Sequence, residues 1–296
     1  MRVLITGGRG QLGSELQRIF NDGCSEIGTI PALYADAEVV ATNANTLDIT
    51  DHEAVLSYIA GGAFDLVINC AAMTDVDGCE KAEDIAFRVN AEAPGNLARA
   101  CEKAHAKLVQ ISTDYVFPGT DPVPRAEEDA TGPLSAYGRT KLLGEQLALE
   151  NSSRCFVVRT AWLYGYEGKN FVKTMLRLGD DRSEVTVVDD QRGNPTSAND
   201  LAHEILEIAA TDNYGIYHCT NQGTCSWADF AQAIMKGAGL DCEVKRCTSQ
   251  EYIAMNPSSA ARPLYSSLQN KHLEDTIGDN MRPWEDALAN FLLNLK

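Results

Sequence analysis

A tyrosine and a lysine four residues apart are the clearest candidates for catalysis. Tyr137 and Lys141 lie in the segment Tyr-Gly-Arg-Thr-Lys, where the apolar spacing of residues 137–149 predicts a helix. Residues at i and i+4 share one helix face. A nearby ammonium lowers the ordinary phenol pKa of about 10, so the pair can donate a proton to a carbonyl undergoing reduction. Alone, such a pair is more often a solvated surface pair, and the neighbouring motifs decide between the two interpretations.

A glycine-rich segment near the start of the chain is suited to a dinucleotide. Gly7, Gly10 and Gly13 give the pattern GxxGxxG between an apolar run, residues 3–6, and a segment with helical spacing. Glycine allows the positive φ of a tight turn and lets a pyrophosphate approach the backbone. The N-terminus of the next helix adds free N–H groups. The strand before and the helix after predict a dinucleotide site rather than a structural turn.

The end of the second predicted strand, residues 39–42, bears on the choice of cofactor. NAD-selective folds place an Asp or Glu there to bind the ribose diol. Thr42 and Asn43 are uncharged, so the 2′-phosphate of NADP is not repelled, although no arginine stands at this strand end to hold it. We therefore expect NADP(H) as the cofactor, with NAD(H) tolerated.

The elements around these motifs alternate between strands and helices. Apolar runs at 3–6, 39–42, 66–70, 108–112 and 155–159 predict strands, and helical spacing is found at 12–20, 82–104 and 137–149. A helix over 82–104 must kink or divide at Pro94 and Gly95. Because strands alternating with helices pair in parallel, we expect an α/β fold with a Rossmann-type, doubly wound parallel sheet. Thr113, at the end of a strand, then faces the ligand crevice and can hydrogen-bond a carbonyl oxygen.

The second half of the chain predicts a smaller α/β lobe. Helical spacing recurs at 171–178, 200–210, 230–237 and 284–295, and residues 185–188 and 216–219 read as extended. We expect residues 1–160 to form the NADP-binding domain with the catalytic groups. Residues 161–296 would mainly bind substrate, with some segments returning to the first domain. The long link at 21–37 receives no functional interpretation.

Several segments resemble a known family. The glycine loop, Asn69-Cys-Ala-Ala72, Ser112-Thr113 and Tyr137-x-x-x-Lys141 resemble the extended short-chain dehydrogenase/reductases. Ser112-Thr-Asp-Tyr-Val-Phe117, Asp190-Gln-Arg-Gly-Asn-Pro-Thr196 and Arg262-Pro-Leu-Tyr-Ser-Ser267 are more selective and resemble the dTDP-4-dehydrorhamnose reductase family, nearly end to end. The resemblance implies NADPH-dependent reduction of dTDP-4-dehydro-L-rhamnose to dTDP-L-rhamnose, the last step of dTDP-rhamnose biosynthesis.

The resemblance also implies a role for each site residue. The catalytic group would be Thr113, Tyr137 and Lys141. The cofactor would be bound by Gly7, Gly10, Gln11, Leu12, Gly13, Asp48, Ile49, Ala71, Ala72 and Asn90, together with Tyr137 and Lys141. The dTDP-sugar substrate would be bound by Thr74, Val76, Asp114, Trp162 and Arg262. Core packing is the alternative for Trp162, and an ordinary surface position is the alternative for Arg262.

Two other functions fit the same motifs. One is another nucleotide-sugar reductase or an epimerase of the same superfamily, and an epimerase would retain its cofactor and consume none. The other is a non-catalytic regulatory subunit, against which the intact Thr113, Tyr137 and Lys141 argue. Some relatives hold magnesium between subunits with acidic residues. Glu15 is present here, but Asn199 is a poor ligand for a hard cation, so we predict no metal and a monomer or weak homodimer.

Composition narrows the partners further. Lys and Arg number 25 against 42 Asp and Glu, a net charge of −17, which disfavours nucleic acid and anionic membrane surfaces. The nine cysteines include no CxxC pair and read as free thiols in a reducing compartment. With no signal peptide and no apolar stretch of membrane-spanning length, we expect a cytoplasmic protein.

Overall fold

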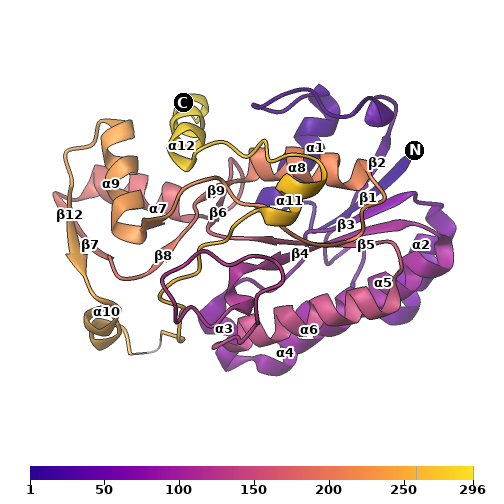
Figure 1. The fold of residues 1–296 in the computed structure, drawn as a ribbon, viewed down its shortest axis with the longest axis horizontal. Helices are drawn as coiled ribbons and strands as arrows, with labels where there is room; N and C mark the ends of the chain where they lie inside the picture. Colours follow the sequence, from indigo (N-terminus) through magenta and orange to yellow (C-terminus); the bar gives the residue numbers. More distant parts are fainter. Residues whose placement is uncertain (258, 296) are drawn as a thin grey trace.

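A six-stranded parallel sheet forms the centre of the molecule (Figure 1). The computed structural model describes residues 1–257 and 259–295. The strand order is β10-β5-β4-β3-β1-β2, and every neighbouring pair is parallel. The strands are β1 (Arg2–Thr6), β2 (Glu38–Ala41), β3 (Leu66–Asn69), β4 (Lys107–Thr113), β5 (Cys155–Thr160) and β10 (Gly215–His218). The predicted Rossmann-type doubly wound sheet is confirmed.

Helices cover both faces of this sheet (Figure 1). On one face α1 (Gln11–Asp22) packs against α8 (Ala198–Ala210). On the other lie α2 (His52–Gly62), α5 (Ala93–Ala104) and α6 (Ala136–Asn151). Each face has its own buried apolar cluster, as expected for parallel strands buried on both sides. Three elements from the second half of the chain, α8, β10 and α11 (Lys271–Thr276), pack with this sheet or its helices.

The long helix predicted over residues 82–104 is divided. It consists of α4 (Glu83–Phe87), a π-helical turn at Arg88–Glu92 and α5. Pro94 lies at the start of α5, where its missing N–H costs little. The π-turn widens the helix just before the proline, so the chain continues without a sharp break. A short helix, α3 (Val76–Lys81), precedes it.

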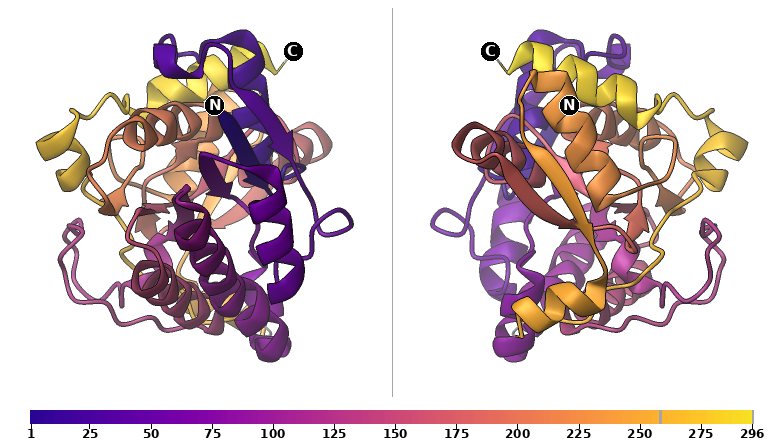
Figure 2. Two further views of the ribbon diagram at one scale, coloured as in Figure 1. Left: turned by 90° about the vertical axis from the view of Figure 1, so that its right-hand side faces the viewer. Right: turned by 90° about the vertical axis from the view of Figure 1, so that its left-hand side faces the viewer.

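The smaller lobe is built around a two-stranded sheet and three helices (Figure 2). Strands β7 (Glu184–Val188) and β12 (Glu243–Cys247) pair in parallel. They share a buried apolar cluster with α7 (Phe171–Asp181), α9 (Trp227–Ala238) and α12 (Trp284–Asn294). A capping box formed by Ser226 and Asp229 is present at the start of α9. The helix α10 (Ser249–Met255) has no buried residue and stands away from α9 and α12 in Figure 1.

Two short pairs of strands join the lobe to the sheet. One pair is β6 (Leu163–Tyr164) with β9 (Thr196–Ser197). The other is β8 (Arg192–Gly193) with β11 (Cys225–Ser226). Because β6 follows β5 after two residues, the end of the central sheet leads directly into the smaller lobe. This junction places Trp162 between the two parts.

The link at residues 21–37 packs over α8. Tyr34 is buried, and its hydroxyl donates a hydrogen bond to the Leu206 carbonyl at 3.0 Å. The backbone N–H of Glu26 donates to Asn199 at 2.8 Å. The link therefore covers the outer face of the first layer.

Two global properties of the chain follow from the structure. All nine cysteines are free, and six of them are buried, as the sequence predicts. Over residues 1–257 and 259–295, no helix is long and apolar enough to cross a membrane.

Candidate active site

One face of α6 carries the two predicted catalytic side chains. The helix begins after Ser135, whose side chain accepts a hydrogen bond from the Gly138 N–H. Lys141 is 4% exposed, and its Nζ donates to the carbonyl of Ile111 on β4 at 2.6 Å. The Tyr137 side chain lies close enough to that of Thr113, at the end of the same strand, for the two to interact. The helix face and the strand end therefore bring the three predicted catalytic residues together.

The hydroxyl of Thr113 is at the centre of this group. It donates to Asp114 Oδ1 at 2.9 Å and accepts from the Tyr115 N–H at 3.2 Å. Asp114 is 2% exposed, and its other oxygen, Oδ2, has no hydrogen-bond partner among the described residues. A buried carboxylate oxygen without a partner is costly. Asp114 is therefore suited to accept a hydrogen bond from a bound hydroxyl group.

Burial controls the protonation of these groups. It raises the pKa of Tyr137 well above its ordinary value, and the interaction with Thr113 opposes that rise. The lowering of this pKa expected from Lys141 is not found, because desolvation is the largest cause of the shift and raises the pKa. Burial lowers the pKa of Lys141 to about 8, with Glu145 opposing it, and raises the pKa of Asp114 to about 6. At neutral pH, Tyr137 holds a proton to give.

A cavity of about 440 Å³ lies above these side chains, at the carboxyl ends of the strands. Four parts of the chain meet in its wall: the glycine loop, the segment after β3, the end of β4 with α6, and the segment after β5. Of the predicted residues, the lining includes Gly10, Gln11, Leu12, Gly13, Ala71, Ala72, Thr74, Thr113, Asp114, Tyr137, Lys141 and Trp162. This is the crevice that ligands occupy in open α/β sheets.

The glycine loop fits a pyrophosphate. Gly7 has φ +68°, and a Cβ there would lie 2.7 Å from the Ala71 nitrogen. A Cβ at Gly13 would collide with the Gly7 carbonyl. Helix α1 begins after Gly10 without a side-chain cap, so its first N–H groups are available to an anion. The backbone thus forms a cradle that any larger residue at these positions would fill.

The structure adds a cation that the sequence interpretation missed at the end of β2. The Gly8 N–H donates to the Thr42 carbonyl at 2.8 Å, which puts the glycine loop against this strand end. Arg9, the next residue, is exposed. Arg9 is therefore a candidate cation near the end of β2, and an arginine inside a glycine loop is the signal that could have found it.

Four predicted cofactor residues lie outside the cavity lining, and Gly7, at the turn of the glycine loop, is one of them. Asp48 accepts hydrogen bonds from the backbone and hydroxyl of Thr50, and Ile49 is buried in the core. Asn90, in the π-turn, is 1% exposed; its amide accepts from the Met73 N–H and donates to the Met73 carbonyl. Asn90 therefore shapes the wall from behind, by fixing the segment after β3.

Trp162 has both a packing contact and a place in the cavity wall. Its ring stacks on Trp227 with centroids 3.5 Å apart and planes 7° from parallel. Its φ is +46°, a strained conformation for a bulky residue. Such strain is held in place only when the surroundings require it, and it concentrates at ligand sites.

A second cavity, of about 580 Å³, lies in the smaller lobe beyond this stacked pair. It is lined by Trp227, Arg262 and Tyr252, the last on α10, and by apolar side chains of α7 and β7. Arg262 pairs with Asp77 at 3.2 Å, in α3, the helix that Val76 begins. Val76 lines neither cavity. The other predicted substrate residues are divided between the two cavities. Thr74, Asp114 and Trp162 line the first, and Arg262 lines the second.

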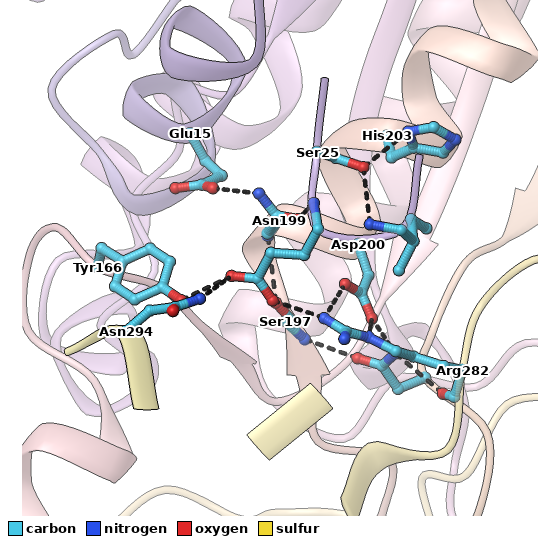
Figure 3. Close-up of polar contacts among 12 residues, drawn as sticks. Glu15, Ser25, Tyr166, Ser197, Asn199, Asp200, His203, Arg282 and Asn294 are labelled. Atoms are coloured by element: carbon cyan, nitrogen blue, oxygen red, sulfur yellow. Dashed lines mark hydrogen bonds and ion pairs between the residues drawn. The ribbon is translucent and has the colours of Figure 1, made fainter. Parts of the chain in front are cut away.

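Acidic side chains at the junction of the two parts are already neutralised (Figure 3). Glu15 pairs with Arg18 and accepts from the Asn199 amide at 2.6 Å. Asp200 pairs with Arg282 at 2.8 Å, and Arg282 also pairs with Glu26 on the 21–37 link at 2.7 Å. These donors do not fit a divalent cation. Across the described ranges, no group of three or more His, Cys, Asp or Glu side chains could hold a metal ion.

Comparison with known proteins gives a consistent result. The family described as the RmlD substrate binding domain matches residues 1–296. A dTDP-4-dehydrorhamnose reductase from Clostridium acetobutylicum ATCC 824 is 44% identical, with a TM-score of 0.93, over 100% of this chain and 99% of the other. The reductase from Bacillus anthracis strain Ames, solved in complex with NADP, is 39% identical, with a TM-score of 0.91, over 99% of each chain.

Curated relatives with other names include a second ketoreductase. A probable dTDP-4,6-dihydroxy-2-methyloxan-3-one 4-ketoreductase from Streptomyces antibioticus is 40% identical over 97% of this chain and 93% of that protein.

Proposed function

This chain belongs to the family of the RmlD substrate binding domain, and we propose how its site carries out the reaction of that family. The protein is an NADP-dependent oxidoreductase that reduces dTDP-4-dehydro-L-rhamnose to dTDP-L-rhamnose, the last step of dTDP-rhamnose biosynthesis. The observation that carries the assignment is that Thr113, Tyr137 and Lys141 line the same cavity as the glycine loop.

The glycine loop would hold the cofactor. The free N–H groups at the start of α1 are suited to its pyrophosphate, and the exposed Arg9 would favour a 2′-phosphate. Ala71 and Ala72, held through Met73 by Asn90, would lie along the cofactor. NADPH, when bound, supplies the hydride that reduces the C4 ketone.

The catalytic residues would handle the proton. The sugar ketone would lie against Thr113 and Tyr137, and Tyr137 would give its proton to the developing alkoxide. The buried ammonium of Lys141 would stabilise the phenolate that remains. Asp114, with its unpartnered oxygen, would accept a hydrogen bond from a sugar hydroxyl. Each group is already positioned by β4 or α6, so little reorganisation is required.

The nucleotide part would extend into the smaller lobe. Trp162 would present its indole to the sugar ring at the boundary between the cavities. The second cavity would take the nucleotide end, with Arg262 near its phosphates. Arg262 already shares its charge with Asp77, so its contribution to anion binding would depend on how far that ion pair opens.

The test is steady-state NADPH oxidation against a panel of nucleotide-linked 4-keto sugars. We expect the highest kcat/KM with dTDP-4-dehydro-L-rhamnose. Preference for another 4-keto sugar would favour the alternative that the similarity to the Streptomyces antibioticus ketoreductase raises. Conversion of sugar without net NADPH consumption would indicate an epimerase. No conversion with any of them would favour a regulatory subunit.

The proposal also covers the localisation of the chain, its oligomeric state and its binding of nucleic acid. We propose that the chain acts in the cytoplasm as a monomer or weak homodimer, and that it binds no nucleic acid. The net charge of −17 supports the last point, because a nucleic-acid site requires a basic surface. Sedimentation at micromolar concentration would reveal a stable oligomer and correct this part of the proposal.

A further inference from the structure

We propose that Glu145, with its ion-pair partner Arg159, is a positioning residue for the catalytic group. This inference rests on the proposed function and concerns the same site. Glu145 is one helical turn beyond Lys141 and is not a member of the cavity lining. It acts by fixing α6 against β4 and β5, and by placing a carboxylate next to the Lys141 ammonium.

Three side chains on one face of α6 contact the end of β4. Tyr137, Lys141 and Glu145 are spaced at i, i+4 and i+8, and so lie in a row along the helix. Tyr137 lies close to Thr113, and Lys141 donates to the Ile111 carbonyl. Glu145 accepts a hydrogen bond from Ser112, which lies between Ile111 and Thr113 on β4. The contact made by Glu145 therefore holds the same segment of β4 that Tyr137 and Lys141 contact.

The neighbouring strand completes the arrangement. Arg159 on β5 is the register partner of Ser112, and its guanidinium donates to both oxygens of Glu145, at 2.9 and 2.7 Å. The side chains of this pair are 3% and 2% exposed. Such a bidentate pair has a fixed geometry. The helix, the catalytic strand and the next strand are thus joined at one carboxylate.

The charge of Glu145 has a second consequence. The Lys141 ammonium lies in a buried site where desolvation favours the neutral amine, and Glu145 opposes this effect. Ionisable groups face the network from each surrounding element. They are Tyr137 on α6, Cys70 after β3, Asp114 after β4, Arg159 on β5 and His218 on β10. The backbone carbonyl of Glu127, in the loop before α6, accepts a hydrogen bond from Arg159. Glu145 is the carboxylate among them that raises the pKa of Lys141.

The experiment compares pH profiles of kcat/KM for the wild-type enzyme and two variants. Glu145→Gln keeps an acceptor for Ser112 but removes the charge, and it leaves Arg159 buried without its partner. The double variant Glu145→Gln/Arg159→Met removes both charges, a replacement that is often neutral for stability. In both variants, we expect the basic limb of the profile to move down by about one pH unit or more, because an opposite charge has been removed from Lys141.

A matched control separates positioning from stability. Asp200→Asn breaks the other buried ion pair, with Arg282, far from the catalytic row. It should lower the unfolding temperature and leave the pH profile unchanged. The inference is overturned if the basic limb of the double variant matches that of the wild type, or if Asp200→Asn shifts it equally. Absence of wild-type turnover would instead refute the proposed function, so the two failures are distinguishable.

Discussion

At the scale of single residues, the account depends on the proton of Tyr137. Its hydroxyl is buried, and its raised pKa keeps it protonated at neutral pH. Tyr137→Phe removes this proton and preserves the ring. We expect kcat to fall by at least about 100-fold, within the range of general acid catalysis. The binding of NADPH, measured by titration, should change little, and near-normal turnover would remove Tyr137 from the mechanism.

The cofactor preference also belongs to this scale. Asn43 accepts a hydrogen bond from the Asn45 N–H, which an aspartate can accept equally. Asn43→Asp should therefore keep the turn while adding a carboxylate that binds the ribose diol and repels a 2′-phosphate. The ratio of kcat/KM for NADH to that for NADPH should rise. An unchanged ratio would mean that this strand end does not face the ribose.

The side chain of Trp162 belongs both to the cavity wall and to the packing of the smaller lobe. Trp162→Ala should raise KM for the sugar nucleotide, because an apolar platform of about 1–3 kcal/mol is lost, and it should leave NADPH binding intact. Its stack on Trp227 gives the alternative, a loss of about 3–5 kcal/mol in folding stability. Thermal unfolding measured beside sugar kinetics separates the two. Trp284→Ala, in the core of the smaller lobe, is the control for stability loss alone.

At the scale of elements, α8 carries a buried carboxyl whose ionisation is unfavourable. Burial raises the pKa of Glu204 from 4.5 to about 8, and Asp279 adds to the rise. Both folded and unfolded states are protonated well below pH 4.5. As pH rises towards 8, the unfolded chain ionises first, so this group destabilises the fold progressively.

Glu204→Gln should remove that penalty. We expect the unfolding temperature to rise by about 2–4 °C at pH 8, for a gain of about 1 kcal/mol, and to change less near pH 4.5. Glu207→Gln, one turn later and more exposed, is the matched control and should have a smaller effect. A lower unfolding temperature at pH 8 would show that the carboxylate is stabilised by partners in the folded state.

The elements also mark what the sequence can predict. The strands can be identified from the sequence because the strands of a parallel sheet are continuous runs of apolar residues. Helix α2 is missed, although Asp51 caps it and Val55 and Ile59 lie on its buried face. Its weak amphipathic pattern and terminal glycines hide it.

Long-range register is the part that sequence does not supply. Glu145 and Arg159 each have an ordinary local context, and only the pairing of Ser112 with Arg159 brings them together. Likewise, Arg9 becomes a cofactor candidate only when Gly8 bonds to Thr42. Thr113, Tyr137 and Lys141 could be predicted because spacing and strand position determine where they lie.

At the scale of the whole molecule, an acidic chain must bind two anionic ligands. The net charge of −17 opposes them, so attraction must be local. Under the proposed function, the start of α1, Lys141 and Arg262 would supply it around the two cavities, with Arg9 near the end of β2. At the junction, Arg282 pairs with Asp200 (Figure 3) and Arg18 pairs with Glu15, so these acidic groups add little repulsion near the site.

The most direct test of the central claim follows the hydride. NADPH carrying deuterium at the transferred position is supplied with dTDP-4-dehydro-L-rhamnose, and the product is examined by mass spectrometry and NMR. The account predicts one deuterium at C4 of dTDP-L-rhamnose for each NADPH consumed, and little product from Tyr137→Phe. A product without deuterium at C4, or with deuterium at another carbon, would contradict it.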